Sequence, residues 1–219
     1  MNRHRKEEIR TMNPTARRWL SLLGLAVTVA ACGSLDNNRS PATASYDLGL
    51  AAPVTQQGGI APASIEVRAP SWLASTAMQY RLEYVQPSPR QAYVESRWAS
   101  PPSEMLEVGL RRMLLPDGKG ACRLRVDLDE FTQVYSTHAS SQAVVAARIE
   151  LLAPRGENVL ARRDLSIVEP APGADAAGGV TAHRRAIRRL AEELAGWLGS
   201  IAAAPEHAAL VERACSKGN

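Results

Sequence analysis

The sequence predicts an α+β domain in which an antiparallel sheet of about six strands carries two main helices. Several short segments alternate apolar and polar residues, a period that is typical of half-buried strands. Two longer segments repeat apolar residues every three or four positions, as amphipathic helices do. One helical segment interrupts the strands and the other follows the last of them. This order favours helices packed on one sheet.

The strand pattern occurs in six places. The predicted strands are 65–68, 78–85, 92–98, 122–128 with a continuation through 134, 143–152, and 159–168. The turn Gln86-Pro87-Ser88-Pro89 joins the second and third as a hairpin, because proline and serine favour turns. Pro154-Arg155-Gly156 likewise returns the chain between the last two strands.

The first helix is predicted to begin at Ser100-Pro101-Pro102, with serine as the N-cap and proline at the first helical position. Its apolar face consists of Leu106, Leu110, Met113 and Leu114. A loop rich in proline, alanine and glycine, 170–179, precedes the second helix, which we expect from about Thr181 to Ile201.

The second helix carries four arginines opposite its apolar face: Arg184, Arg185, Arg188 and Arg189. Two interpretations stand. The arginines could meet lipid headgroups, or they could form a solvated face. The spacing favours the solvated face, because Arg188–Glu192 and Arg189–Glu193 are four residues apart and can form ion pairs.

Residues 1–31 have the layout of a cleaved secretory signal peptide. Arg17 and Arg18 precede an uncharged apolar run, 20–31, that ends in small residues. The run is shorter than the roughly 20 residues that span a bilayer as a helix. Met12 is a second credible start, because it gives a compact basic end without Glu7 and Glu8.

The end of this run, Val29-Ala30-Ala31-Cys32, resembles a bacterial lipobox. The resemblance implies that Val29, Ala30 and Ala31 are recognised by the signal peptidase and that the Cys32 thiol takes a diacylglyceryl group. The alternative is an ordinary signal peptide that happens to end near a cysteine. We predict a lipoprotein whose mature chain begins at Cys32 and carries acyl chains such as palmitate, because several chains anchor stably where one does not.

The residue after the cysteine is Gly33, not aspartate. By the sorting rule for such lipoproteins, this favours the outer membrane of a Gram-negative bacterium, with the protein facing the periplasm. Residues 32–56 are poor in large apolar groups, so we expect a lipidated N-terminus and flexible tether there. Residues 57–204 are the predicted folded domain, and 205–219 a C-terminal tail.

The excess of 26 basic over 22 acidic residues comes from the predicted signal peptide. Six basic and two acidic residues precede Cys32, so the remaining chain holds equal numbers of each. A balanced charge gives no reason to expect a nucleic-acid partner.

Two cysteines, Cys122 and Cys215, remain after the anchor. In an oxidising periplasm such a pair can form a disulfide, although sequence alone does not prove the connectivity. The four histidines are scattered and no paired-cysteine spacing is present, so we expect no metal site and no cofactor. Asp127, Asp129 and Glu130 could bind a metal, but they are better explained as the solvated face of a strand.

Residues that could support catalysis are few. His138 lies near Ser140 and Ser141, but no nucleophile elbow or acid partner accompanies them. We therefore predict that the chain is not an enzyme. Three tryptophans could line a lipid groove or, as buried aromatics usually do, anchor the core: Trp72, Trp98 and Trp197.

Several segments resemble the ABC-type transport auxiliary lipoproteins, the PqiC-like family. They are Tyr80-Arg81-Leu82 and 93–102, followed by Leu106 and Leu110, with 46–49 and 65–67 matching in order. The most specific stretch is Ser96-Arg97-Trp98-Ala99 before the paired prolines. The resemblance covers about 46–201 and leaves the tail after Pro205 unexplained.

This resemblance implies a non-enzymatic accessory of an ABC/MCE-type system that carries lipids between two membranes. The expected partners are the membrane itself, through the lipid anchor, and the MCE-domain and ABC transporter components; homo-oligomers are also expected. The resemblance brings no catalytic residue, so Cys32 is the one chemically defined position. The alternative is a structural or assembly-factor lipoprotein that supports an outer-membrane barrel or a cell-wall synthase.

Overall fold

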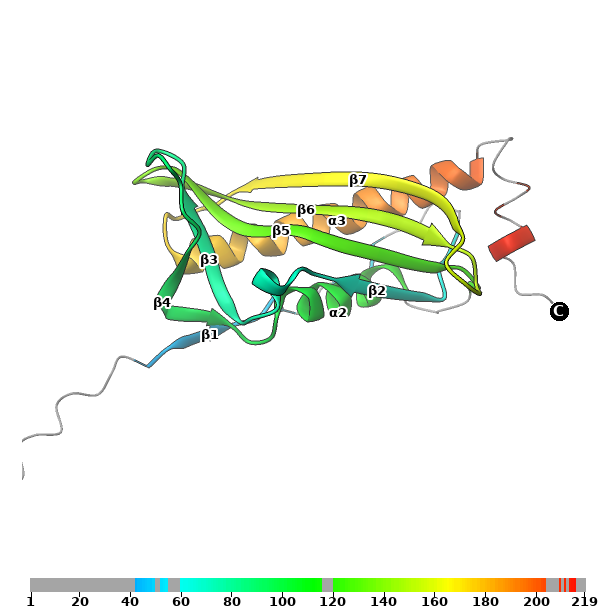
Figure 1. Ribbon diagram of the computed structural model, residues 1–219, viewed down its shortest axis with the longest axis horizontal. Coiled ribbons are helices and arrows are strands. Elements are labelled where there is room, and N and C mark those ends of the chain that lie inside the picture. The colour runs from blue at the N-terminus through cyan, green and yellow to red at the C-terminus, as the bar shows by residue number, and fades with distance from the viewer. Residues whose placement is uncertain are drawn as a thin grey trace, which may run out of the picture. The chain divides into compact units, whose positions relative to one another are not determined.

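Figure 1 shows a computed structural model of the chain. The structure describes residues 42–49, 52–54, 60–115 and 120–203, together with 209, 211 and 213–215. Residues from Thr43 onward form one compact unit. The predicted signal peptide, the lipobox with Cys32 and most of the predicted tether lie outside the described residues.

Seven strands form one sheet. They are β1 (Ala44–Tyr46), β2 (Ser64–Arg68), β3 (Ala77–Leu82), β4 (Gln91–Trp98), β5 (Arg123–Thr137), β6 (Ser140–Leu152) and β7 (Val159–Pro170). Their order is β1-β4-β3-β5-β6-β7, and β2 also pairs with β5. The long strand β5 has room for two partners, because β2 pairs along 123–127 and β3 along 133–135.

The predicted α+β class is confirmed, but the sheet is mixed rather than antiparallel. Strands β5, β6 and β7 form an antiparallel meander, and β3 with β4 forms the predicted hairpin. Strands β2 and β3 run parallel to β5, because the connection that leads to β5 contains a helix that returns the chain, as parallel pairing requires.

The strand that the sequence did not predict, β1, lies in the segment that we expected to be a flexible tether. It pairs in parallel with β4, and the Ala99 N–H donates to the Tyr46 carbonyl at 2.7 Å. Three residues are too few to show an alternating pattern, so pairing with β4, rather than local sequence, makes this segment a strand.

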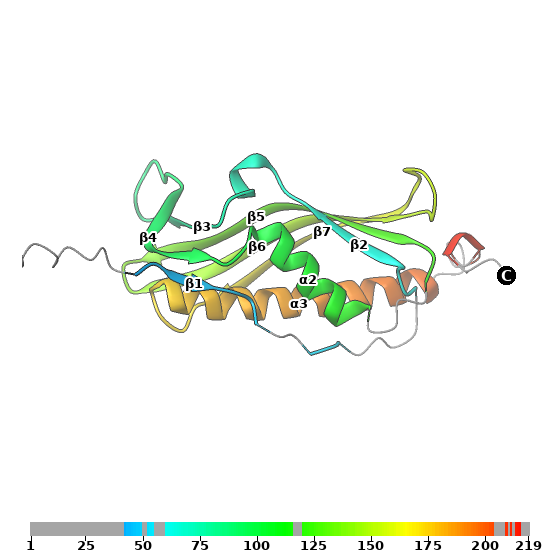
Figure 2. The same cartoon turned by 90° about the horizontal axis from the view of Figure 1, so that it is seen from below.

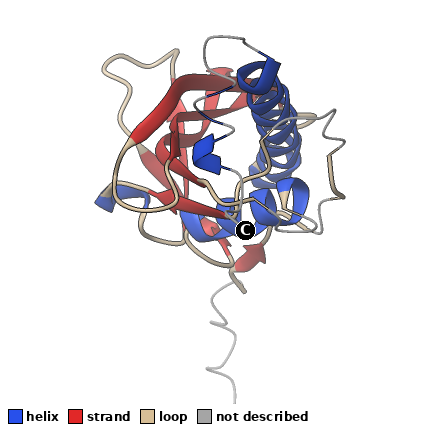
Figure 3. Ribbon diagram, turned by 90° about the vertical axis from the view of Figure 1, so that its right-hand side faces the viewer, coloured by secondary structure: helices blue, strands red, loops and turns tan. Residues whose placement is uncertain are grey.

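Two helices, α2 (Pro102–Leu114) and α3 (Ala176–Ala203), lie side by side on one face of the curved sheet (Figures 2 and 3). A short 3-10 turn, η1, covers Ser71–Leu73. The core lies between the helices and the sheet. A bulge near Asp129 keeps the inward side chains of β5 on this face, because Leu128 before it and Phe131 after it are both buried.

The first helix starts one residue later than predicted. Pro101, not Ser100, is the N-cap residue of α2, and Pro102 takes the first helical position. The Ser100 hydroxyl donates to the Glu104 carboxylate instead of to the backbone.

The second helix begins at Ala176, ahead of the predicted Thr181. Its first turn contains two glycines that pack too closely for a side chain. A Cβ at Gly178 would overlap the Gly173 carbonyl, and one at Gly179 would overlap the Gln133 side chain. The Asp175 carboxylate caps this end by accepting from the Gly178 N–H at 2.6 Å. The glycines therefore belong to the helix, not to the predicted loop.

The predicted tail contributes to the core at the positions that the structure describes. Val211 and Cys215 are buried, and Cys215 forms a disulfide with Cys122 just before β5. The Ala121 N–H also donates to the Cys215 carbonyl at 3.2 Å. Among the helices of the described ranges, none combines the length and the apolar composition needed to cross a membrane.

Candidate functional site

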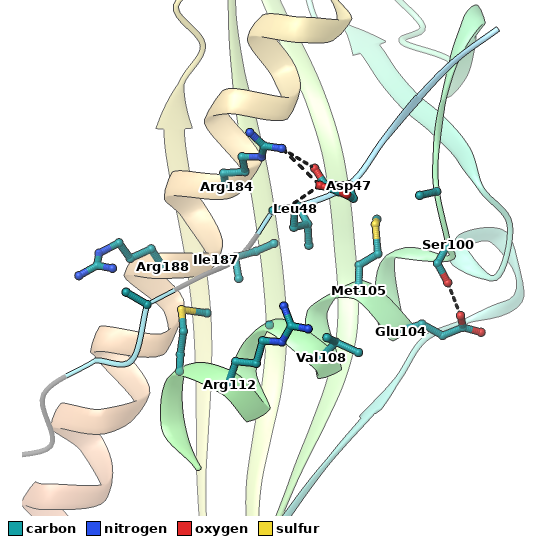
Figure 4. Close-up of a pocket in the computed structure, with 15 residues that line it drawn as sticks. Asp47, Leu48, Ser100, Glu104, Met105, Val108, Arg112, Arg184, Ile187 and Arg188 are labelled. Atoms are coloured by element: carbon teal, nitrogen blue, oxygen red, sulfur yellow. Dashed lines mark hydrogen bonds and ion pairs between the residues drawn. The ribbon is translucent and has the colours of Figure 1, made fainter. Parts of the chain in front are cut away.

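A groove of about 860 Å³ lies between α2 and α3 (Figure 4). Its apolar lining includes Met105, Val108 and Met113 from α2, Ile187 from α3, and Leu48 from the segment that follows β1. Three segments that are far apart in the sequence therefore form one apolar surface.

The spacing of residues on each helix explains why these side chains face the groove. Met105, Val108 and Arg112 recur at intervals of three and four along α2, and so share one face. Gly109 lies on the same side and leaves room, since a Cβ there would approach the Ile187 Cγ2 only to 3.8 Å. The groove is therefore open because Gly109 has no side chain and because α3 lies beside this face of α2.

The third wall, Asp47-Leu48-Gly49, is held in a tight local turn. Gly49 has a φ of +71°, a conformation that suits glycine, and its N–H donates to the Asp47 Oδ1 at 2.7 Å. Arg184 fixes this turn to α3, because its Nη2 donates to the Asp47 carbonyl at 3.1 Å and approaches the Asp47 Oδ1 to 3.4 Å.

Three arginines contribute to the groove, and they differ in their partners. Arg184 is held by Asp47, and Arg188 forms the predicted pair with Glu192 at 3.0 Å. Arg112 has no hydrogen-bond or ion-pair partner among the residues that the structure describes. The groove thus combines an apolar lining with a guanidinium group that is available to a ligand.

The other predicted pair on α3 is wrong. Arg189 pairs with Glu169 of β7 at 3.3 Å, not with Glu193. Glu193 instead accepts from Arg163 of β7 at 3.0 Å. These side chains bind across to the neighbouring strand, which sequence spacing along one helix does not reveal. Most of the arginine face is therefore paired with carboxylates.

None of the three tryptophans lines the groove. Trp98 is buried in the core, where its ring lies 5.5 Å from Phe131 and 5.4 Å from His183 between centroids. Trp197 is buried as well, whereas Trp72 is 54% exposed. Trp98 and Trp197 serve as core anchors, and the interpretation of the three as a lipid groove is wrong.

His183 is a residue whose environment the sequence analysis missed. It is 2% exposed, and its ring stacks on Phe131 at 4.3 Å. The Nδ1–H donates to the Gly179 carbonyl at 2.8 Å, and the Nε2 has no partner among the described residues. Burial lowers the pKa of His183 to about 4, so the ring is neutral near pH 7. Its position on the apolar face of α3 was the available signal.

A buried polar cluster fixes the first turn of α3 to β5. The Gln133 Nε2 donates to the Ser141 Oγ at 2.8 Å and to the Asp175 carbonyl at 3.0 Å. The Tyr93 hydroxyl donates to the Gln133 Oε1 at 2.9 Å and is also hydrogen-bonded to Tyr135. Burial, followed by the bond to Tyr135, raises the pKa of Tyr93. The cluster uses its polar atoms internally and so has a structural role.

The residues considered for catalysis lie in separate contacts. His138 Nδ1 and the Tyr84 hydroxyl are hydrogen-bonded at 3.0 Å at the tip of the sheet. Ser141 accepts from Gln133, and the Ser140 hydroxyl lies 3.4 Å from that of Ser136. The structure therefore does not bring His138 and the serines together as a nucleophile and base.

The carboxylates considered as metal ligands are paired with arginines. Asp129 binds Arg148 through two contacts of 3.0 Å, and Asp127 lies 4.0 Å from Arg125. Glu130 binds Arg90 through two contacts of 2.8 Å. No cluster of three or more potential metal ligands occurs within the described ranges.

Glu130 titrates at lower pH than an ordinary glutamate. Burial alone would raise the pKa of Glu130, but hydrogen bonds from Arg90 and Thr132 lower it below its ordinary value. This carboxylate is therefore held charged by its neighbours, as expected of a structural ion pair.

Comparison with known proteins identifies the family. The sequence model of the ABC-type transport auxiliary lipoprotein component matches residues 46–195. The chain belongs to this family. The match includes all the residues of the groove, from Asp47 to Arg188. None of the curated proteins compared with this auxiliary lipoprotein matches it significantly.

Solved structures share the fold. The crystal structure of protein XCC0632 from Xanthomonas campestris is similar over 72% of this chain and 95% of its own, with 21% identity and a TM-score of 0.60. A second crystal structure, of an uncharacterized protein, covers 70% of this chain and 97% of its own, with 16% identity and a TM-score of 0.51. At these identities the likeness supports the fold of the auxiliary lipoprotein and no more.

Proposed function

We propose that this auxiliary lipoprotein is a non-enzymatic component of an ABC/MCE-type system that moves lipids between membranes. It is anchored in the outer membrane by acyl chains on Cys32 and faces the periplasm. The observation that carries the proposal is the family match over residues 46–195. The lipobox-like Val29-Ala30-Ala31-Cys32 supports the anchor.

The described groove suits a binding role. Its lining offers apolar side chains and guanidinium groups, which contact a ligand without reacting with it. An accessory of this kind acts by holding a transported molecule or a partner protein near the transporter. We therefore expect stable contacts with an MCE-domain protein or an ABC transporter component, and self-association of the anchored domain.

The anchor is tested on full-length protein expressed in its host. The intact mass should correspond to a chain that starts at Cys32 with acyl groups added, and density fractionation should place the protein with outer-membrane markers. Cys32→Ser should leave the signal uncleaved by the lipoprotein peptidase. Ser40→Ala, a conservative change in the predicted tether, is the control and should retain the acyl mass. A native N-terminus elsewhere, without acyl mass, contradicts the anchor.

The partnership is tested by affinity capture of the full-length protein from detergent extracts. The MCE-domain protein or ABC transporter component of the same host should be captured, and light scattering should show a mass above that of one chain. Capture of a barrel-assembly or cell-wall synthase component instead would favour the structural alternative. Turnover of a small substrate by the purified protein would overturn the non-enzymatic role.

A further inference from the structure

We infer that the α2–α3 groove binds one acyl chain of an anionic glycerophospholipid, with the headgroup phosphate held by Arg112 and Arg188. The inference rests on the proposed function and deepens it, because it gives the auxiliary lipoprotein a lipid site of its own. The inference is based on one observation: the same groove combines an apolar lining with the Arg112 guanidinium group, which has no partner among the described residues.

The apolar lining suits an alkyl chain. Val108 is 51% exposed, so apolar surface in the groove remains in contact with water until a ligand covers it. Met105 and Met113 are buried and lie beneath this surface as the floor of the groove, where flexible thioether side chains can adapt to the shape of a bound chain. A volume of about 860 Å³ lies within the range of about 300–1,000 Å³ found for small-molecule sites. That size suits one chain with its headgroup rather than a whole two-chain lipid.

The arginines suit a phosphate. Figure 4 shows Arg112 extending from α2 into the space between the two helices. Arg188 lines the same groove, and its one ion pair among the described residues is with Glu192, an exposed pair of the kind that contributes little stability and can open. Guanidinium groups bind phosphate oxygens through paired, charge-assisted hydrogen bonds. The lining carries three arginines, Arg112, Arg184 and Arg188, against the two carboxylates of Asp47 and Glu104, so the groove has a net positive charge that favours an anionic headgroup.

An acyl chain fits this groove better than an extended peptide does. An extended peptide brings backbone N–H and C=O groups that need partners when they are buried. The two long walls are helices, whose backbone groups away from the ends are already bonded within the helix. An alkyl chain brings no such groups. An acidic helix of a partner protein would also avoid this cost, and the experiment below distinguishes it.

The test uses full-length protein purified in a non-ionic detergent. The probe is lysophosphatidylglycerol with a photoreactive diazirine in its acyl chain. After irradiation, peptide mapping should place the label on the α2 peptide that contains the exposed Val108, and on residues beside it in the groove such as Met105. Unlabelled lysophosphatidylglycerol should displace the probe. Glycerol phosphate, which lacks the chain, and monoacylglycerol, which lacks the phosphate, should displace it far less at the same concentration.

Two variants make the test specific. Val108→Asp places a carboxylate in the lining at an exposed position, so the protein should fold while labelling of the groove is lost. Arg112→Gln should raise the half-saturating probe concentration about tenfold, the effect of one lost charged hydrogen bond. Arg111→Gln is the matched control, since Arg111 is the neighbouring exposed arginine and pairs with Glu107 at 3.4 Å. It should leave labelling unchanged.

Label that is spread over the surface, or that is unaffected by Val108→Asp, overturns the inference. Displacement of the probe by a helical peptide of the transporter partner, but not by lysophosphatidylglycerol, also overturns it and assigns the groove to that partner. If partner capture succeeds and the groove stays unlabelled, the lipid site fails and the proposed function stands. If the groove is labelled as expected and no transporter component is captured, the proposed function fails instead.

Discussion

Helix α3 passes through two environments that differ in how completely they are filled. In its first turn, Gly178 and Gly179 leave no room for a Cβ. One turn further along, the His183 ring packs against the rings of Trp98 and Phe131. Further along, Ile187 and Arg188 line a groove, and Gly109 of the opposite helix leaves space beside them. One helix thus has a closed end and an open middle.

The difference shows where this fold needs a fixed geometry and where it leaves room for a ligand. At the closed end, Gln133 binds the first turn of α3 through its amide, and a buried network of this kind specifies one arrangement. In the open middle, the opposite wall is formed by long side chains such as Met105 and Arg112, and Arg112 has no hydrogen-bond or ion-pair partner among the described residues.

The largest expected effect is loss of the covalent link that ties the C-terminal residues to the start of β5. A disulfide between Cys122 and Cys215 spans a sequence separation of 93 residues. In the loop-entropy model such a link stabilises the folded state by about 4–5 kcal/mol. The double variant Cys122→Ser/Cys215→Ser should lose most of this in urea unfolding.

The control for the disulfide is wild-type protein with its thiols reduced, which should unfold at nearly the same urea concentration as the double variant. Non-reducing peptide mapping of periplasmic material decides whether the link exists. Two free thiols, or equal stability of the oxidised protein and the double variant, would contradict it.

The second effect compares the same substitution in the two environments. Gly178→Ala forces a methyl group onto the Gly173 carbonyl, a backbone atom that cannot simply rotate away. We expect a loss of about 3 kcal/mol in the free energy of unfolding. Gly109→Ala meets only ordinary contacts, at 3.8 Å and 3.9 Å, and alanine favours helix, so a gain of up to about 1 kcal/mol is expected.

Urea unfolding of the two variants measures both changes against the wild type. Opposite signs would sharpen the contrast between the closed end and the groove. Equal losses would mean that α2 and α3 are packed as tightly at Gly109 as at Gly178, and the groove would not be open in solution.

The elements with long periodic patterns were predictable from the sequence. Alternation located β4 to β7 and the hairpin between β3 and β4, and the apolar spacing located α2. These patterns are reliable because, in a long strand or helix, a residue's position along the element decides whether its side chain faces the core or the solvent. The first turn of α3 was not predictable, since Gly178 and Gly179 resemble a loop until Gln133 packs against them.

The groove could be predicted only in part. The shared helical face of Met105, Val108 and Arg112 is visible in the sequence, because these residues recur at helical spacing. Their opposition to Ile187 and Leu48 is not, because it depends on how α3 and the segment after β1 are placed against α2. The position of that segment depends on the parallel pairing of β1 with β4. Because β1 has three residues, its sequence shows no alternating pattern from which this pairing could be predicted.

The last expected effect, smaller than the losses from the disulfide and from Gly178→Ala, tests the closed end through pH. Burial lowers the pKa of His183 to about 4, whereas its ordinary value is 6.5. Between these values the unfolded chain binds a proton that the folded chain does not, so stability falls as the pH drops through this window. From pH 7 to pH 5, His183 should remove about 2 kcal/mol from the free energy of unfolding.

His183→Phe should abolish this part of the pH dependence, because phenylalanine does not titrate and keeps an aromatic ring beside Trp98 and Phe131. Ile187→Val is the matched control: it loosens packing one turn further along α3 but retains the histidine, so its stability should still fall between pH 7 and pH 5. Urea unfolding at both pH values gives the comparison. If His183→Phe loses as much stability as the wild type over this interval, other groups cause the decline and His183 is not held neutral by the closed end.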